Sequence, residues 1–483
     1  MEWYSRYLCY FLGVCLLGLY IRLNDQRLQV LPPELEKLSP KRLSLEDVRA
    51  EAKKLDSQES IASKEVLPPK TGRRYIVVGG GGFLGGWIIT KLLHRGERYD
   101  HIRVLDIRPP QSEVVQDALL KGSQFLPVDI TNYDSLEAAF TAPWPALANG
   151  EPESEITVIH TVASIRYYER HLAFMDRSSK VNVGGAKNVV KASIAAGATV
   201  LLCTSSAAVG VHNGRVLLWP WETEPPIFRQ IINDDESRLP KRREEFFSNY
   251  PYTKIQGERI VRAADKTPLR SGKVLRTGAL RPGNAIFGPR GDLVCDSYTQ
   301  RGKNESWVHP VLSSFTYVEN CATAHLCYEA RLLELLNGGK NPDIGGQAFC
   351  ITDPGPTPTF GDFYTMLEAL TNGQTHFPKV SPTLMLFIAY GIETYTRVQL
   401  ALSTTLGSWV SWVVPPITGI IINLQPPLFT LCNMHVIVDD SRARLPPEKG
   451  GLGYTGAWTT LQGTYQAMKE HHARLEQLAV KAA

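Results

Sequence analysis

Two residues of this chain have the types and spacing needed to move a proton at an alcohol or ketone oxygen. Tyr250 and Lys254 lie four residues apart in Asn249-Tyr-Pro-Tyr-Thr-Lys254, so a helix would carry them on one face. An ammonium stabilises a nearby phenolate, so the pair predicts a lowered pKa for Tyr250 and a role as general acid or base. Because Y-x-x-x-K also occurs by chance on surface helices, the pair needs support from other motifs.

A serine in a second motif could hold the reacting oxygen. The segment Leu201–Val209 begins as an apolar run, typical of a buried strand, and passes into Thr204, Ser205 and Ser206. In open α/β sheets, ligands bind at the carboxyl ends of the strands, where these hydroxyl groups would lie. We predict that Ser206 bonds the reacting oxygen, with Ser205 as the alternative. A serine that only caps the next helix remains open.

A glycine-rich turn predicts the cofactor that such chemistry requires. Gly79, Gly82 and Gly85 form a G-x-x-G-x-x-G pattern directly after the apolar run Tyr75–Val78. A strand, a glycine turn and a helix let the backbone approach a pyrophosphate and direct a helix N-terminus at its charge. We therefore expect a dinucleotide, although any strand-to-helix turn can use glycine for positive φ. Lys254 could hold the hydroxyl groups of the nicotinamide ribose.

Two acidic residues at strand ends bear on which dinucleotide binds. Asp106 ends the run Ile102–Asp106, where a carboxylate would accept hydrogen bonds from the adenosine ribose and favour NAD. Arg108 could instead meet the 2′-phosphate of NADP, and Asp106 could simply cap a turn. Asp129 ends another run and could reach the adenine, or cap the helix expected near Tyr133.

The segments that must position these residues alternate between apolar strands and helical patterns from Arg74 to about Gly291. This alternation predicts an α/β fold with a doubly wound parallel sheet of the Rossmann type. The predicted strands are Tyr75–Val78, Arg103–Leu105, Phe125–Ile130, Thr157–His160, Thr199–Thr204 and Val274–Arg281, and Lys180–Ala196 is a predicted helix.

Composition excludes several other classes of protein. The net charge is only +4 over 483 residues, and we expect no nucleic-acid partner. Eight cysteines are scattered without a CxxC pair or metal-ligand spacing, so we expect reduced thiols and no metal site. A hydrophobic content of 43% supports a sizeable core.

The N-terminus predicts a membrane anchor. Tyr7 to Ile21 is uncharged, and the interfacial aromatic residues Trp3 and Tyr4 precede it. A cleaved signal peptide is the alternative, but no small-x-small cleavage site follows. Arg22 and Arg27 after the run outnumber Arg6 before it, which favours a cytosolic location for the rest of the chain.

A second apolar stretch, Val398–Val438, contains no Lys, Arg, Asp or Glu. Pro415 and Pro416 would break a spanning helix and leave its backbone groups unsatisfied in lipid. We predict a monotopic patch that dips into the bilayer. The alternative is a buried helical subdomain.

In their order along the chain, the glycine turn, the serine and the tyrosine–lysine pair resemble those of the extended short-chain dehydrogenase/reductase family. Within it, the chain resembles the 3β-hydroxysteroid dehydrogenase branch, which includes sterol 4α-carboxylate 3-dehydrogenases. The supporting segments are Gly79–Gly85, His160–Ser164, Asn182–Gly185, Thr204–Ser206, Tyr250–Lys254, Leu280–Pro289, Phe315–His325 and Leu452–Tyr454.

The resemblance implies roles for the candidate residues. Ser206, Tyr250 and Lys254 become the catalytic set, and the cofactor contacts become Gly79, Gly82, Gly85, Asp106, Asp129, Lys254 and the backbone of Ala163. Asn182 would support a proton relay or make a structural hydrogen bond. Arg166 would pair with a substrate carboxylate or with a surface acid.

The observations together predict an organisation along the chain, although the first 70 residues have no counterpart in the compact members of the family. We expect a membrane anchor (1–22), a charged linker or helix (23–70), an NAD-binding Rossmann catalytic domain (71–291) and a smaller C-terminal substrate-binding, membrane-associated region (292–483). The segment from Val211 to Ser248 looks long for the family and could be a lid, a partner surface or a solvated insertion.

The implied activity is a membrane-associated, NAD-dependent oxidation of a 3β-hydroxysteroid or sterol at the endoplasmic reticulum, with the catalytic domain facing the cytosol. The alternative cofactor is NADP, and the expected protein partner is a second copy of the chain in a homodimer. The alternatives are a reductase or dehydrogenase of a terpenoid or polyketide pathway and a non-catalytic NAD-binding scaffold.

Overall fold

The core of the protein is a mainly parallel β-sheet. The computed structural model describes residues 2–57, 66–145 and 154–482, so residues 58–65 of the predicted linker lie outside the described part. Within that part, the sheet has the order β11-β8-β5-β4-β1-β2-β3, and the short β7 pairs antiparallel with β8. The strands are β1 (Arg74–Val78), β2 (Ile102–Asp106), β3 (Gln124–Pro127), β4 (Ile156–His160), β5 (Val200–Thr204), β7 (Thr267–Pro268), β8 (Val274–Pro282) and β11 (Gln347–Ile351).

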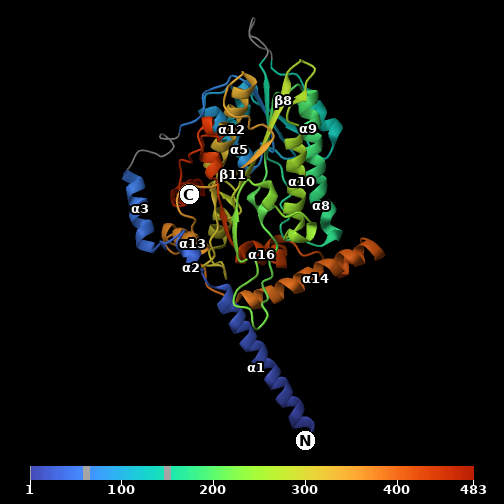
Figure 1. The fold of residues 1–483 in the computed structure, drawn as a ribbon, viewed down its shortest axis with the longest axis vertical. Coiled ribbons are helices and arrows are strands. Elements are labelled where there is room, and N and C mark those ends of the chain that lie inside the picture. The colour runs from blue at the N-terminus through green and yellow to red at the C-terminus, as the bar shows by residue number, and fades with distance from the viewer. Residues whose placement is uncertain (1, 58–65, 146–153, 483) are drawn as a thin grey trace.

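Helices cover both faces of this sheet, as in the predicted doubly wound fold (Figure 1). On one face, α5 (Phe83–His94) packs against α12 (Val318–Leu336). The other face is covered by α7 (Tyr133–Thr141), α9 (Ala186–Ala195) and α10 (Asn249–Ala263). Both β1 and β5 are buried along their whole length, which explains why they have near-continuous apolar sequences.

The strand order sets the position of a ligand crevice. Going along the chain, β1, β2 and β3 extend in one direction across the sheet, and β4 then returns to the other side of β1. Such a reversal opens a crevice at the carboxyl ends of β1 and β4, where dinucleotides bind in this architecture. The candidate residues that follow β1, β2, β4 and β5 therefore all lie at the carboxyl ends of the strands, on the same side of the sheet.

Two differences from the predicted elements concern the sheet and one helix. The sheet includes β11, which lies after residue 291, where no strand was predicted. This strand pairs with β8 in parallel. The predicted helix 180–196 begins earlier, as α8 (Met175–Ser179), and includes a π-helical turn at Lys180–Gly185 before α9. The predicted strands otherwise match the observed ones closely.

Smaller units surround the sheet. Parallel pairs join β6 (Arg229–Ile232) to β12 (His435–Val438), and β9 (Ile286–Phe287) to β10 (Thr316–Tyr317). Within the predicted linker or helix of residues 23–70, α3 (Leu45–Ser57) packs against α13 (Phe360–Leu370) and α18 (Thr460–Ala482). The remaining helices are α2 (Pro33–Glu36), α6 (Glu113–Leu120), α11 (Cys295–Arg301), α14 (Pro382–Leu406), α15 (Val410–Val413), α16 (Pro426–Asn433) and α17 (Ser441–Arg444).

The N-terminal helix α1 (Glu2–Leu28) projects from the body (Figure 1). Among the described residues, one helical stretch is long and apolar enough to cross a membrane. It is Trp3–Glu36, with a mean hydropathy of 1.5 over its best window, and this window is almost wholly exposed. The base of α1 packs against α14.

The uncharged stretch Val398–Val438 divides into two parts with different surroundings. Its first part carries exposed apolar side chains, among them Trp409, Trp412 and Ile421. Its second part is buried, since Phe429 of α16 lies in the core and β12 pairs with β6. The two interpretations of this stretch therefore apply to different halves of it.

Candidate active site

The helix α10 carries the two residues whose spacing predicted a proton-transferring pair. Tyr250 and Lys254 lie one turn apart, and both are buried where α10 packs against β5 and β8. Glu258 lies a further turn along the same buried face. At Gly257, a Cβ atom would stand 2.0 Å from the Asn182 carbonyl oxygen of the π-helical turn. The absence of a side chain at Gly257 therefore lets α10 approach this turn closely.

Tyr250 meets Ser206 at the carboxyl end of β5. Burial raises the pKa of the Tyr250 phenol, and a hydrogen bond with the Ser206 side chain opposes that rise without cancelling it. The lowered pKa predicted from Lys254 is therefore wrong, because removal of the phenol from water outweighs the hydrogen bond with Ser206. Tyr250 is neutral at physiological pH.

The two serines that sequence reasoning left open have different partners. The Ser206 hydroxyl accepts a hydrogen bond from the Ala208 amide (3.2 Å), which caps the short 3₁₀ turn at Ala207–Gly210, and it also contacts Tyr250. Ser205 is buried and faces the Glu258 carboxylate. Ser206 therefore serves both as a cap and as a partner of Tyr250.

Lys254 is buried beside several polar side chains. Burial lowers the pKa of its ammonium, and the nearby Cys203 and Glu258 oppose that effect. His160, at the end of β4, has a pKa lowered to about 3 by burial and by the Lys254 charge, so it is neutral. A cavity of about 10 Å³ is lined by these residues and by Asn182 and Ser205. This is roughly the space of one water molecule.

The glycine turn between β1 and α5 has the geometry that a dinucleotide requires. Gly79 has a φ of +88°, and a Cβ atom there would stand 2.5 Å from the Thr161 hydroxyl. A Cβ atom at Gly85 would stand 2.2 Å from the Gly79 carbonyl oxygen, so only glycine lets α5 begin this close to β1. Gly82 is the N-cap of α5 and offers no side-chain cap, which leaves the first amides of α5 open to an anion.

The other predicted cofactor residues lie along the same edge. Asp106 ends β2 and accepts a hydrogen bond from the Gly81 amide (3.1 Å), so its carboxylate faces the glycine turn and keeps further acceptor capacity. Arg108 is exposed two residues further on. Asp129 is exposed and accepts from the Thr131 amide (2.9 Å), whereas Asn132 caps α7. Ala163 follows β4 and is half-buried beside the crevice.

Two further candidates have structural partners. The Asn182 side chain accepts from the Ser164 amide (2.8 Å) and donates to the Ser164 carbonyl (3.2 Å) and the Thr253 hydroxyl (3.0 Å). These bonds tie the π-helical turn to α10 and to the loop after β4. Arg166 pairs with Glu169 (3.2 Å), a buried carboxylate that Arg177 also binds, rather than with a surface acid.

Sequence reasoning missed a buried ion network that joins α10 to β8. Arg281 of β8 binds both oxygens of Glu258, at 2.7 and 3.0 Å, and Arg262 of α10 binds Glu258 at 2.9 Å. Glu236 reaches the same two guanidinium groups from the long segment 211–248, at 2.5 Å each. The i, i+4 series Tyr250, Lys254, Glu258 could have indicated Glu258, but no local signal indicated Glu236.

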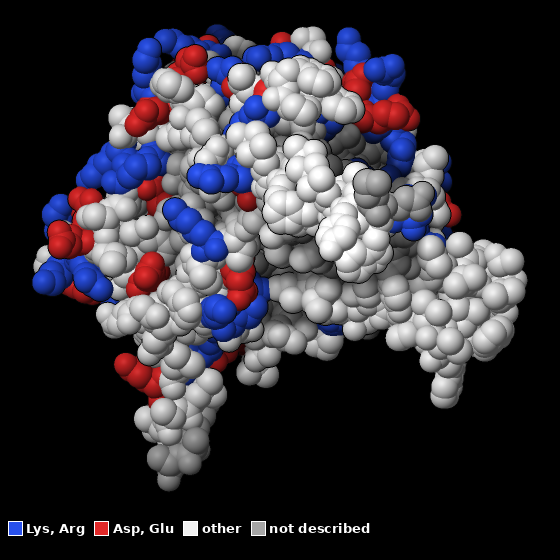
Figure 2. Space-filling view, turned by 90° about the horizontal axis from the view of Figure 1, so that it is seen from below, with Lys and Arg blue, Asp and Glu red and all other residues white. Residues whose placement is uncertain are grey.

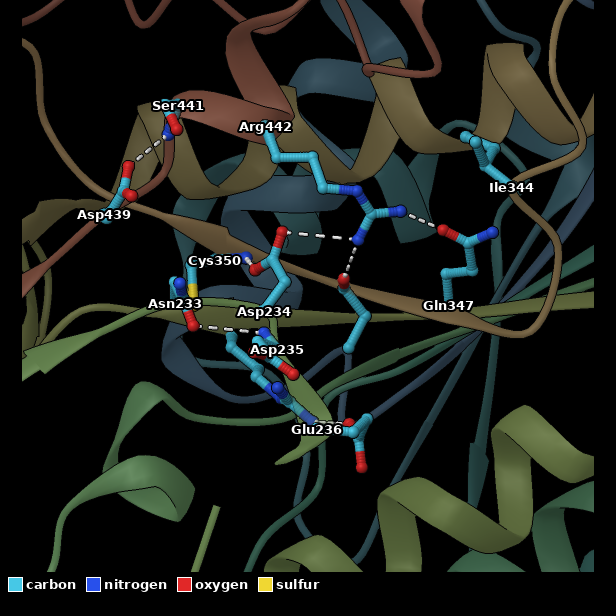
Figure 3. Close-up of polar contacts among 12 residues, drawn as sticks. Asn233, Asp234, Asp235, Glu236, Ile344, Gln347, Cys350, Asp439, Ser441 and Arg442 are labelled. Atoms are coloured by element: carbon cyan, nitrogen blue, oxygen red, sulfur yellow. Dashed lines mark hydrogen bonds and ion pairs between the residues drawn. The ribbon is translucent and has the colours of Figure 1, made fainter. Parts of the chain in front are cut away.

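Neighbours of Glu236 fix that segment to the edge of the sheet (Figure 3). The Cys350 amide of β11 donates to Asp234 (2.5 Å), and Arg442 of α17 lies 3.5 Å from the same carboxylate. Arg442 also binds Gln347 and the Ala348 carbonyl. The turn at 233–236 is therefore part of the folded body, rather than a loose, solvated insertion.

Comparisons with known proteins identify the family of this chain. The model of the 3-beta hydroxysteroid dehydrogenase/isomerase family matches residues 76–377. A 3beta-hydroxysteroid-dehydrogenase/decarboxylase isoform 1 of Arabidopsis thaliana is 28% identical over 343 residues, which cover 67% of each chain. Sterol-4-alpha-carboxylate 3-dehydrogenase erg26, decarboxylating, of Schizosaccharomyces pombe is 29% identical over 291 residues, 60% of this chain and 72% of that protein.

Solved structures support the architecture alone. A UDP-glucose 4-epimerase of Thermotoga maritima superposes with a TM-score of 0.52 at 17% identity, covering 83% of this chain and 99% of the epimerase. The parallel sheet, the glycine turn and the Tyr250–Ser206 contact occur in the part of the chain that the family model covers. The chain belongs to the 3-beta hydroxysteroid dehydrogenase/isomerase family.

Proposed function

We propose that this protein is a membrane-associated, NAD-dependent dehydrogenase that oxidises the 3β-hydroxyl group of a steroid or sterol to a ketone. The observation that carries the proposal is the buried contact between Tyr250 and Ser206 at the same sheet edge as the glycine turn. A protein that only bound NAD would need neither residue.

The chain's own groups would perform the proton transfer. Ser206 donates a hydrogen bond to the alcohol oxygen, and Tyr250, as phenolate, takes the hydroxyl proton on its Oη atom. Because burial raises the pKa of the Tyr250 phenol, formation of its phenolate in this proposal depends on the positive charge of Lys254, one turn along the same helix. NAD, when bound, supplies the acceptor for the hydride that leaves the alcohol carbon.

We further infer that the substrate is a sterol that carries a 4α-carboxyl group. Two relatives have names that specify decarboxylation, and one of them specifies a sterol 4-alpha-carboxylate. Oxidation at C3 would give a β-keto acid, which loses CO₂ with little further catalysis. The site would then need no residue dedicated to the decarboxylation step.

The proposed location is the endoplasmic reticulum membrane, with the catalytic body in the cytosol. Support comes from the exposed, apolar helix α1, from Arg22 and Arg27 on its body side, and from exposed apolar residues of the stretch from Val398 to Leu424. A bilayer-bound enzyme could take a sterol directly from the membrane.

Asp106 is expected to determine the choice of cofactor. A carboxylate facing the ribose site repels a 2′-phosphate, so Asp106→Ala should lower the preference for NAD over NADP by about 1–2 kcal/mol, or roughly 5–30-fold. Binding of NADH and NADPH, followed by nucleotide fluorescence, measures the ratio directly. Arg108→Ala is the matched control and should leave the NAD preference unchanged or stronger. An unaltered ratio in Asp106→Ala would contradict the assignment.

Substitution of the two serines should have different effects on kcat. Ser206→Ala removes the hydroxyl that contacts Tyr250 and should lower kcat by about 10²-fold, the low end of the range for removing a proton-transfer partner. Ser205→Ala removes a hydroxyl that faces Glu258 and should leave kcat within a few-fold of the wild type. Steady-state NADH formation compares the two variants, and equal losses would reject the distinction.

One experiment tests the proposed function as a whole. Detergent-solubilised protein is given NAD⁺ and a panel of 3β-hydroxysterols with and without a 4α-carboxyl group, and NADH formation is measured. Turnover that requires the carboxyl group supports the sterol carboxylate, and turnover on plain 3β-hydroxysteroids shifts only the substrate class. Binding of NAD without turnover of any sterol in the panel would reject the sterol dehydrogenase and favour a dehydrogenase of a terpenoid or polyketide pathway or a non-catalytic role.

A further inference from the structure

Two tryptophans project from the long segment 211–248. Trp219 and Trp221, which flank Pro220, are 56% and 75% exposed, and their rings stack in parallel with centroids 5.4 Å apart. We call these three residues the tryptophan tip. Two adjacent exposed indoles are uncommon on a surface that only meets water, and clustered exposed apolar side chains mark interaction sites.

Hydrogen bonds fix the tip to the base of α1. Tyr20 donates from its hydroxyl to the Leu218 carbonyl (3.0 Å), and Asn24 accepts from the Leu218 amide (3.0 Å). Arg27 donates to the carbonyls of Trp219 (3.3 Å) and Pro220 (2.9 Å). The tip therefore cannot swing freely relative to α1.

The tryptophan tip is bound at the point along α1 where the helix passes from an exposed to a buried environment. Residues 3–19 of α1 are exposed throughout, whereas Asn24 and Leu28 are buried against the body. The tip lies at this transition, where a helix that crosses a bilayer would leave the hydrocarbon. Indole rings, with an apolar body and a polar N–H group, are enriched at that depth.

The start of α14 also contacts this part of α1. At the start of α14, the Thr383 hydroxyl accepts from the Asn24 side chain (2.8 Å), and the Thr383 amide donates to Asp25 (3.0 Å). The first turns of α14 expose Leu384 and Ile388. Seen from below, this side of the molecule has a broad surface of uncharged residues, with the charged residues gathered mainly away from it (Figure 2).

Charged groups beside the tip suit a phospholipid headgroup layer. Arg215 lies 5.9 Å from the Trp219 ring centroid and pairs with Glu222, and Arg27 holds the tip's backbone. Arginine side chains at this level can reach lipid phosphates while the indoles lie slightly deeper.

We propose that the tryptophan tip inserts into the headgroup region of the bilayer that α1 enters, and thereby holds the catalytic body at a fixed orientation to the membrane. The inference rests on the membrane association in the proposed function, but not on the catalytic reaction. A single helix would leave the body free to tilt, whereas α1 and the tip together supply two contacts.

Fluorescence quenching by brominated lipid tests the proposal on the full-length protein. The protein is reconstituted in phosphatidylcholine bilayers, either plain or brominated near the headgroup, and tryptophan emission is compared with that of Trp219→Phe/Trp221→Phe. In plain lipid the variant loses the emission of two indoles. In brominated lipid the difference in emission between wild type and variant should be much smaller, because the bromine atoms already quench these two indoles in the wild type.

Two controls make the outcome decisive. Trp144→Phe removes an indole that packs over Arg103 in the sheet layer, and its loss should be the same in both lipids. Trp3→Phe reports on α1 and should behave like the tip variant. If Trp3 is quenched and the tip is not, the tip lies in water, and only the proposed insertion of the tip is rejected. If neither is quenched, both the insertion of the tip and the proposed membrane association are rejected.

Discussion

Tyr250→Phe is expected to lower the rate of NADH formation by about 10²–10⁴-fold, the range for removing a general acid or base, while NADH binding stays unchanged. The phenylalanine ring fills the same buried space beside β5, so only the hydroxyl and its bond with Ser206 are lost. The loss should therefore fall on kcat. Initial rates with NAD⁺ and the best sterol of the panel measure it, and nucleotide fluorescence measures binding.

Tyr252→Phe is the matched control for this change. Tyr252 lies on the same helix, but its ring contacts Phe246 at a centroid distance of 5.5 Å, away from Ser206. Removing its hydroxyl should leave kcat within a few-fold of the wild type. If Tyr250→Phe keeps more than about a tenth of the wild-type rate, a difference of only about 1.4 kcal/mol, another group must move the proton.

The parts of the site that depend on local spacing could be predicted from the sequence. The glycine turn requires close backbone contacts within a few residues, and the structure places a positive φ at Gly79 and a very close approach at Gly85. Tyr250 and Lys254 share a helix face for the same local reason. The order of the motifs along the chain then indicated the family, which the family match confirms.

What could not be predicted depends on residues far apart in the sequence. Glu236 and Arg281 meet across 45 positions, and nothing in the local sequence of either indicates the other. The direction of the Tyr250 pKa shift depends on burial, which a spacing pattern does not reveal. The strand β11 was missed because the alternation of strands and helices ends before it and α12 intervenes.

The uncharged stretch Val398–Val438 illustrates another limit. Lipid and protein core both select apolar side chains, so composition alone cannot distinguish them. The structure separates the two halves, since Trp412 is 91% exposed whereas Phe429 is fully buried. The pairing of β12 with β6 decides the second half, and that pairing joins segments about two hundred residues apart.

The largest effect on stability is expected at Glu258. Glu258→Gln leaves the buried guanidinium of Arg281 short of its main counter-charge, and loss of one partner of a buried pair costs about 3–5 kcal/mol of folding free energy. The thermal unfolding midpoint in detergent, followed by circular dichroism, should fall clearly. The double variant Glu258→Gln/Arg281→Met should recover part of the loss, because it removes the uncompensated charge as well.

Glu236→Gln provides the matched comparison, because Glu236 binds the same two arginines from a half-exposed position. Its side chain is 39% exposed, so water compensates its loss and the change should cost no more than about 1 kcal/mol. Equal shifts in the midpoint for the two variants would mean that burial does not set the strength of this network.

The acid side of the stability profile provides an independent check on Glu258. Burial tends to raise the pKa of its carboxyl, but Arg281 and Arg262 outweigh burial and leave the pKa below the usual 4.5. A carboxyl whose pKa falls on folding adds stability above its unfolded pKa, and this stability is lost as the pH drops through the folded value. The difference in midpoint between wild type and Glu258→Gln should therefore be constant near neutral pH and shrink below about pH 4.5. A difference in midpoint that does not change with pH would mean that the substitution acts through altered packing. A difference that shrinks at low pH would show that the charge of Glu258 stabilises the helix that carries Tyr250 and Lys254.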